Sequence, residues 1–333
     1  MAKRTIDKAK VAKKDEFYTQ LEDINNELRH YREYFRGKTV LCNCDDPRVS
    51  NFFTYFAYNF EFLGLKKLIT TCYKNQNMDL FSMNKSEQAV YLVYEGDKNG
   101  NHIPDAEEIG VKPLKGDGDF RSKECIELLK EADIVVTNPP FSLFREYVAQ
   151  LMEYDKKFLI IGNVNALSYK EIFPLVKDNR VWLGASIHSG DRKFWVPDTY
   201  ELNAAGCGID DDGKKFIKVK GVRWFTNLDY KERHDDIPLY KSYSPEEYPT
   251  YDNYDAINVG KTAEIPRDYD GVMGVPITFI DKYNPDQFEI LGMSASAGYN
   301  ADIVGIPFKG DKDARPLING KNTYARIFIK KRK

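Results

Sequence analysis

The tetrapeptide Asn138-Pro139-Pro140-Phe141 brings together groups that can act on the amino group of a nucleobase. The side-chain oxygen of Asn138 and the carbonyl oxygen of Pro139 can both accept hydrogen bonds from one exocyclic NH2. The ring of Phe141 can stack on the base that carries this amino group. The four residues are therefore predicted to form a catalytic site for a base that has left its stack.

A buried strand is predicted directly before the tetrapeptide, because residues 134–137 are all apolar or β-branched. The two prolines fix φ and lack an N–H, so this strand ends in a stiff turn. In open α/β sheets, ligands bind at the carboxyl ends of parallel strands. A plain strand-ending loop is the alternative, since Asn-Pro is common in turns, but it leaves the second proline unexplained.

Segment 132–144, ADIVVTNPPFSLF, resembles motif IV of the amino-group methyltransferases, and in particular their adenine-N6 subset. The resemblance implies that S-adenosylmethionine is the methyl donor, S-adenosylhomocysteine the product, and Asn138 a neighbour of both cofactor and base. An adenine N6 lone pair is delocalised into the ring. No strong base is required, however, if acceptors hold both amine hydrogens and favour an sp3-like nitrogen in the transition state.

The element Phe17-Tyr18-Thr19 precedes the first predicted strand and resembles motif X of adenine methyltransferases. The backbone and hydroxyl of that motif help to hold the methionine part of the cofactor, which implies a cofactor-binding role for these three residues. A structural alternative is a capping box, with Thr19 as the N-cap of a helix and Glu22 at its third position. Both interpretations can hold together.

The first strand, predicted over 38–44, ends without the Gly-rich turn that lets the backbone of most methyltransferases approach the cofactor. The turn reads Cys42-Asn43-Cys44-Asp45-Asp46-Pro47, followed by Ser50-Asn51-Phe52 and an aromatic-rich helix. This pattern resembles EcoRI-type adenine-specific DNA methyltransferases. The resemblance implies a cofactor site whose carboxylates face the ammonium or sulfonium charge, formed by Asn43, Cys44, Asp45 and Asp46. An Asx/Pro turn that caps the next helix is the alternative.

Two further cofactor positions follow from the expected order of motifs. Thr71 and Cys72 end the second strand, where motif II stands, although the usual acidic ribose ligand is absent. In Gly116-Asp117-Gly118-Asp119-Phe120, motif III would place Asp117 near the adenine amine and Phe120 beside it as a ring. A Gly-Asp-Gly-Asp string is also compatible with an ordinary turn.

Contacts to DNA are predicted from one loop and from basic clusters. The motif order of the resemblance implies that segment 193–197, KFWVP, is a candidate target-base loop through Phe194 and Trp195. The formal net charge is −2, yet basic residues gather in 1–14, in 214–223 and in the last thirteen residues. Such clusters favour phosphate binding. The residues chosen for it are Lys214, Lys215, Lys330, Lys331 and Arg332.

Strand-like and helix-like segments alternate along most of the chain, which predicts an α/β fold. We expect a doubly wound Rossmann-like methyltransferase sheet with a hairpin over 89–115 and an antiparallel closing hairpin from 180–185 and 216–225. The predicted organisation is a flexible basic arm (1–14), a catalytic domain (15–230) and a small α+β target-recognition domain (231–333).

Composition and short motifs bear on membrane association, cellular compartment and metal binding. The chain has 333 residues, no run of 18 apolar residues and no signal peptide, so no membrane association is expected. Five cysteines, an odd number, indicate reduced cytosolic thiols. Together with the family resemblance, this implies a cytoplasmic protein that is bacterial or phage-encoded. No metal is expected: Cys42-Asn43-Cys44 lacks a second cysteine pair, and an EF-hand-like run over 97–108 has His102 where glycine is required.

The resemblance implies methyl transfer to N6 of a flipped-out adenine in a specific double-stranded DNA sequence. It also implies a monomer that forms the modification half of a restriction–modification system and shares its site with a cognate endonuclease. Two alternatives remain open. One is an rRNA guanine-N2 or protein glutamine methyltransferase with the same Asn-Pro-Pro-Phe motif. The other is a catalytically inert nucleic-acid-binding module, suggested by the glycine-free turn.

Overall fold

A computed structural model describes residues 18–44, 50–71, 89–101, 104, 108–196, 202, 206–294, 304–310 and 314–332. The chain divides into two compact units. The first is Met1–Val164 with Gly184–Leu228, and the second is Asn165–Leu183 with Asp229–Lys333. Segment 165–183 therefore groups with the C-terminal part of the chain. The functional assignment of residues 231–333 to target recognition stays a prediction.

The first unit is built on a large mixed sheet with the order β4-β3-β2-β1-β5-β6-β11. Four central strands run parallel: β2 (Lys67–Thr71), β1 (Thr39–Cys42), β5 (Ile134–Thr137) and β6 (Lys157–Asn163). Antiparallel strands flank them, namely β3 (Val90–Tyr94), β4 (Gly110–Pro113) and β11 (Val222–Thr226). The predicted α/β fold with a large central sheet is confirmed.

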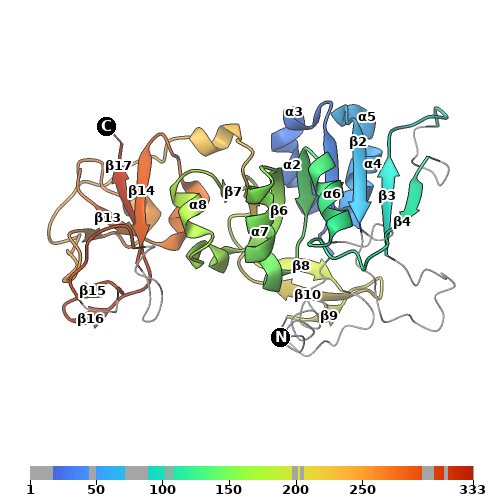
Figure 1. Cartoon of the computed structure of the whole chain (residues 1–333). Coiled ribbons are helices and arrows are strands. Elements are labelled where there is room, and N and C mark those ends of the chain that lie inside the picture. The colour runs from blue at the N-terminus through green and yellow to red at the C-terminus, as the bar shows by residue number, and fades with distance from the viewer. Residues whose placement is uncertain are drawn as a thin grey trace. The chain divides into compact units, whose positions relative to one another are not determined.

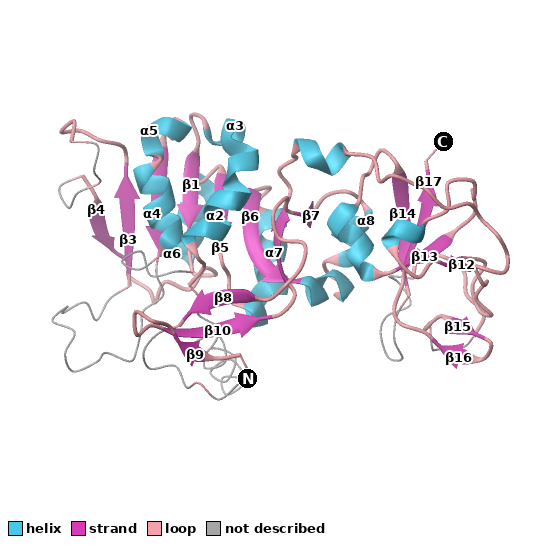
Figure 2. Cartoon of the chain, turned by 180° about the vertical axis from the view of Figure 1, so that it is seen from behind, coloured by secondary structure: helices cyan, strands magenta, loops and turns pink. Residues whose placement is uncertain are grey.

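Helices cover both faces of this sheet. Figures 1 and 2, which view the chain from opposite sides, show α6 and α7 before one face and α2 and α4 before the other. Neighbouring rings of β11 explain the arrangement, because successive strand residues point to opposite faces. Trp224 packs against Phe52 of α4 with ring centroids 6.1 Å apart, and Phe225 packs against Phe144 of α7 at 5.0 Å.

The bounds of these helices follow local signals. The hydroxyl of Ser50 accepts from the N–H of Phe52 at the start of α4, and that of Ser122 accepts from Cys125 at the start of α6. Gly64, with a φ of 63°, ends α5. The helices of the first unit are α2 (Leu21–Leu28), η2 (Arg29–Tyr31), α3 (Arg32–Phe35), α4 (Asn51–Tyr58), α5 (Phe60–Leu63), α6 (Lys123–Glu131), η3 (Phe141–Leu143) and α7 (Phe144–Glu153).

The strand order reverses at β1, which has β2 on one side and β5 on the other. All residues of β1 and β5 are buried, as their uninterrupted apolar runs require. The carboxyl ends of the two strands therefore lie next to each other at this switch point. Asn43 follows one strand and Asn138 follows the other.

The expected closing hairpin has a different form in the structure. Segment 216–225 divides at Gly221, whose φ of 70° reverses the chain between β10 (Lys215–Val219) and β11. Strand β10 pairs with β8 (Arg192–Trp195) and β9 (Gly208–Ile209) in a separate antiparallel sheet. Segment 180–185 meets β11 where Gly184 N donates to Trp224 O at 2.9 Å.

The second unit is centred on an antiparallel pair, β17 (Ile327–Lys331) with β14 (Phe288–Met293). The sheet continues through β13 (Met273–Val275) to β12 (Ile257–Asn258). Thus β17, the basic C-terminal segment, is an inner strand. The other elements of the second unit, with the η4 turn that enters it, are η4 (Val164–Ser168), α8 (Phe173–Lys177), β7 (Trp182–Leu183), η5 (Lys231–His234), η6 (Thr262–Glu264), η7 (Ile277–Lys282), β15 (Leu317–Ile318) and β16 (Lys321–Asn322).

In the part of the chain that the structure describes, no helix combines the length and the apolar character that crossing a bilayer requires.

Candidate active site

Asn138 stands directly after β5 and is only 6% exposed. Its Nδ2 donates a hydrogen bond to the hydroxyl of Thr19 at 3.3 Å, and Thr19 is 2% exposed. Residues that are far apart in sequence, in the predicted motifs X and IV, are therefore in direct contact. Pro139 is also buried, whereas Pro140 and Phe141 are half-buried. Phe141 opens the η3 turn that leads into α7.

Backbone contacts hold the Tyr18-Thr19 segment in place. Tyr18 N donates to Trp195 O at 2.9 Å, and Trp195 N donates to Tyr18 O at 3.3 Å. The side chain of Asn51 donates to Thr19 O at 2.6 Å. The capping-box alternative is wrong, because α2 begins after Gln20 and has no side-chain cap. The hydroxyl of Thr19 is instead turned to Asn138, and Phe17 lies outside the described residues.

The turn after β1 has its own hydrogen bonds. The backbone carbonyl of Asn43 accepts from the hydroxyl of Thr137, and its side-chain oxygen accepts from the hydroxyl of Tyr147. Complete burial raises the pKa of Tyr147 well above its usual value, so this hydroxyl stays protonated and can donate. The side chain of Asn43 thereby ties the end of β1 to helix α7.

Cys44 occupies the left-handed region with a φ of 79°. Most methyltransferases place glycine near this position, and the structure places a half-buried cysteine there. The chain therefore makes the turn after β1 with a cysteine in a conformation that usually favours glycine. Asp45 and Asp46, the predicted partners of the cofactor charge, lie outside the described residues.

The predicted motif III contributes a buried ring and an exposed acid. Phe120 packs edge-on against Tyr147, with ring centroids 5.0 Å apart. Asp117 is exposed, and its carboxylate accepts from the N–H of Asp119 at 3.1 Å, as in an Asx turn. Asp119 forms an ion pair with Arg121 at 2.7 Å. Although burial raises the pKa of Asp119, the hydrogen bonds from Arg121 keep it below its usual range.

The second strand ends at Thr71, which is buried, and Cys72 lies outside the described residues. The motif II position is therefore at the same sheet edge as Asn43 and Asn138, since β2 and β1 are parallel neighbours.

The predicted target-base loop contains one buried ring and one accessible ring. Phe194 is 1% exposed and packs inside the protein, whereas Trp195 is half-buried. The indole N–H of Trp195 donates to Asp210 at 2.9 Å, and the ammonium of Lys214 lies 4.7 Å from its ring centroid. The bond from Trp195, with others from Lys214 and Lys193, lowers the pKa of Asp210 to about 2. Of the two rings, Trp195 is the more accessible, so it is the better candidate for contact with the target base.

The basic residues chosen for DNA contact differ in their surroundings. Lys215 is half-buried on β10, and Lys330 is exposed on β17. The ammonium of Lys331 donates to the carbonyl of Arg267 and lies 3.4 Å from Asp270. Arg332 donates to Pro285 O at 2.7 Å. The C-terminal cluster is therefore built into the second unit, and the side chain of Lys331 has an internal structural role.

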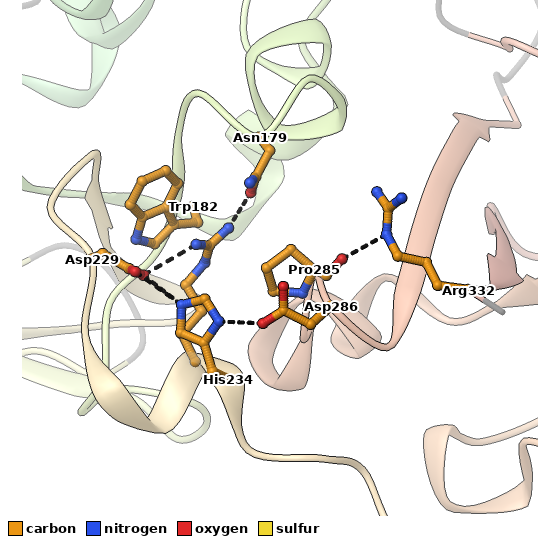
Figure 3. A pocket seen from close by; sticks show the side chains of 8 residues that line it. Asn179, Trp182, Asp229, His234, Pro285, Asp286 and Arg332 are labelled. Carbon is orange, nitrogen blue, oxygen red and sulfur yellow. Dashed lines mark hydrogen bonds and ion pairs between the residues drawn. The ribbon is translucent and has the colours of Figure 1, made fainter.

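A cavity of about 540 Å³ lies within the second unit and had no sequence signal. Figure 3 shows His234 between the carboxylates of Asp286 and Asp229, with distances of 2.5 Å and 2.9 Å. Beside it, the guanidinium of Arg233 lies 3.9 Å from the centroid of the Trp182 ring. The lining consists of Asn179, Trp182, Asp229, Arg233, His234, Pro285, Asp286 and Arg332.

The central strands of the sheet are parallel, and Asn-Pro-Pro-Phe lies at the switch point, where ligands of open α/β sheets bind. The amide and carbonyl oxygens of this segment can accept hydrogen bonds from an amino group. Comparisons with known proteins define the class further. The family model described as "Adenine-specific methyltransferase EcoRI" matches residues 5–332.

Curated relatives agree with this family over nearly their whole length. The chain is 51% identical to the type II methyltransferase M.EcoRI of Escherichia coli, over 99% of this chain and 97% of the relative. It is 39% identical to M.MgeORF184P of Mycoplasma genitalium and 38% identical to M.MpnI of Mycoplasma pneumoniae, each over 98% of both chains. No solved structure gives a significant match.

The chain belongs to the EcoRI family of adenine-specific methyltransferases. It is a site-specific enzyme that methylates adenine in DNA, in the context of restriction–modification. The guanine-N2, glutamine and inert-module alternatives are therefore set aside, and the resemblance carried by the Asn-Pro-Pro-Phe and Cys-Asn-Cys-Asp-Asp-Pro segments is confirmed.

Proposed function

We propose that the protein transfers the methyl group of S-adenosylmethionine to N6 of an adenine that has been flipped out of a specific DNA duplex. The observation that carries this proposal is the position of Asn138, which is buried at the carboxyl end of β5 beside the end of β1. An amide and a following backbone carbonyl in this place can hold both hydrogens of an amino group.

The cofactor is proposed to bind at this sheet edge. Its carboxylate, ammonium and ribose hydroxyls require polar partners, and backbone groups of Thr19, Asn43 and Cys44 together with Thr71 are proposed to supply them. Tyr18 takes part as the neighbour that anchors Thr19, because its own backbone N–H and carbonyl pair with Trp195. The left-handed φ of Cys44 supports close approach of the backbone, the role that glycine has in other turns. The proposed site extends through residues outside the described part of the chain, Phe17, Asp45, Asp46 and Cys72, and toward Asp117 and Phe120. When bound, the cofactor supplies an electrophilic methyl group on its sulfonium.

The residues of the chain position the target. Asn138 and the Pro139 carbonyl accept the two amine hydrogens, while Pro140 stiffens the turn and Phe141 stacks on the extruded adenine. Holding the amine in this way favours the pyramidal nitrogen of the transition state, so correct placement contributes most of the rate. The amine proton leaves after methylation, when the nitrogen is strongly acidic.

DNA binding is assigned to both units. Trp195 with Lys214 and Lys215 is proposed to contact the duplex near the flipped base, and Phe194 to support this strand from inside. The second unit is proposed to recognise sequence, with phosphate contacts from Lys330 and Arg332. The protein is proposed to act as a monomer in the cytoplasm and to protect the site of a cognate endonuclease.

A methyl-transfer assay with labelled S-adenosylmethionine tests the proposal. Duplex DNA should accept label, and digestion to nucleosides should place all of it in N6-methyladenosine. Matched pools of RNA and protein should remain unlabelled. Label in cytosine, in RNA or in protein would contradict the proposal.

A further inference from the structure

We infer that Thr19 is a positioning residue, whose hydroxyl holds the amide of Asn138 by its Nδ2 end so that the Oδ1 end stays turned to the target amine. The inference rests on the proposed role of Asn138. It separates two parts of Thr19: the backbone, proposed to lie at the cofactor, and the hydroxyl, which serves the amide.

The chemistry of an amide makes such a group necessary. The two ends of an Asn side chain have nearly the same size, but Oδ1 only accepts and Nδ2 only donates. The target amine also presents donors, so it is bound only by the Oδ1 end. Packing alone selects poorly between two ends of equal shape, and a hydrogen-bond partner at the far end is required.

The geometry places Thr19 at that far end. Its hydroxyl oxygen lies 3.3 Å from Nδ2, and both side chains are buried. If the hydroxyl were removed, Nδ2 would lose this acceptor in a place with little access to water. Losing a buried hydrogen bond is costly, so the amide would be held less firmly at its Nδ2 end, and its rotation would carry Oδ1 away from the amine.

The position of the hydroxyl is itself fixed from two sides. The carbonyl of Thr19 accepts from Asn51 at the start of α4, at 2.6 Å. The preceding residue, Tyr18, is paired through its backbone with Trp195 of β8. Because both contacts use the backbone of segment 18–19, a change of the Thr19 side chain leaves them in place. A valine at this position retains the shape and removes only the hydroxyl.

The test compares Thr19→Val with Thr19→Ser in the full chain. We measure the single-turnover rate of methyl transfer to duplex DNA at saturating S-adenosylmethionine, the dissociation constant of the cofactor by calorimetry, and the melting temperature. Thr19→Val should slow transfer on the order of 100-fold, the usual cost of a misplaced group near the reacting atoms. Thr19→Ser should stay within about threefold of the parent, and both variants should keep cofactor affinity within about threefold.

Thr54→Val is the matched control, because the hydroxyl of Thr54 donates to Ser50 O at 3.2 Å within the neighbouring helix. This variant should transfer methyl groups at the parental rate. The inference is overturned if Thr19→Val reacts like the parent, if Thr19→Ser is as slow as Thr19→Val, or if the loss of rate is matched by an equal loss of cofactor affinity.

A second comparison isolates the orientation of the amide. In an Asn138→Asp background both ends of the side chain accept hydrogen bonds, so rotation no longer matters. Adding Thr19→Val there should slow transfer by less than about tenfold. An equal loss in both backgrounds would overturn the inference, and failure of the proposed function would appear separately, as full activity of Asn138→Ala.

Discussion

At the scale of single residues, the site depends on side chains that are held by hydrogen bonds to distant parts of the chain. Asn138 is bound by Thr19, and Asn43 by Tyr147. Phe141 differs, because it is half-buried at the start of η3 and its ring can serve either the protein core or the target base.

Replacing Phe141 distinguishes these two roles. If the ring stacks on the extruded adenine, Phe141→Ala should lower the methylation rate by about one to two orders of magnitude, since base–aromatic stacking is worth about 1–3 kcal/mol. Phe141→Trp and Phe141→Tyr should retain much of the activity because either ring offers a face. Melting temperature and rate are measured on the same samples. A destabilised Ala variant whose folded fraction methylates DNA at the parental rate would disprove the stacking role.

At the scale of elements, α2 is fastened to segment 184–186 by one buried carboxylate. Glu27 is 0% exposed, and it accepts from Ala185 N and Ser186 N at 2.8 Å, from the hydroxyl of Ser186 and from that of Tyr31. A Cβ on Gly184 would lie 2.1 Å from its Oε1, so this close approach requires glycine.

Glu27→Ala should therefore lower the free energy of unfolding by about 3 kcal/mol, because buried N–H donors lose their acceptor. Gly184→Ala should destabilise the protein by a comparable amount through the steric clash. Glu22→Ala, an exposed position on the same helix, is the control and should change stability by no more than about 0.5 kcal/mol. Denaturant unfolding measures all three. Equal stability of Glu27→Ala and Glu22→Ala would refute this account of α2.

Some of these elements can be predicted from the sequence, whereas contacts between distant elements cannot. The β5 strand, its end at Asn138 and the hairpin region of β3 and β4 follow from short-range patterns of apolar residues, glycine and proline. The contact of Thr19 with Asn138 agrees with the motif order. The bond from Trp195 to Asp210 and the Glu27 contacts had no such signal. Glu27 lies 158 residues from Ala185, and such pairings depend on how whole elements pack.

At the scale of the whole molecule, the second unit holds a histidine between two carboxylates, Asp286 and Asp229. In the second unit, hydrogen bonds to Asp286 and Asp229 raise the pKa of His234 above its usual value of 6.5. The charged neighbours that line the same cavity are Asp229, Asp286, Arg233 and Arg332. When protonated, the imidazole donates to both carboxylates and links η5 to the residues just before β14.

Stability should depend on pH through this histidine. Because the folded pKa is raised, its contribution is fully present below the unfolded pKa of about 6.5 and is lost as pH rises through the higher folded value. Thermal unfolding followed from pH 6 to pH 9 should show this decline in the parent, and His234→Gln should remove that part of it. A variant with the same decline as the parent would show that another group titrates.

DNA binding should depend on salt although the net charge is −2, since each neutralised phosphate releases counterions. Lys330→Ala should reduce the slope of log affinity against log salt by about 0.9. The control is Lys261→Ala, whose ammonium lies 3.4 Å from Glu264. Lys331→Ala should also lower stability, because its ammonium is bound to Asp270 and to the carbonyl of Arg267. An unchanged slope for Lys330→Ala would exclude a phosphate contact there.

Methyl transfer is proposed to depend on Asn138, which binds the target amine. The most direct test is single-turnover methylation of duplex DNA by Asn138→Ala at saturating cofactor, with S-adenosylmethionine affinity measured by calorimetry on the same preparation. Asn138→Ala should lose transfer by at least about two to three orders of magnitude, as for a lost transition-state acceptor, and should retain cofactor binding. Retained transfer, or loss of cofactor affinity that accounts for the whole effect, would contradict this role of Asn138.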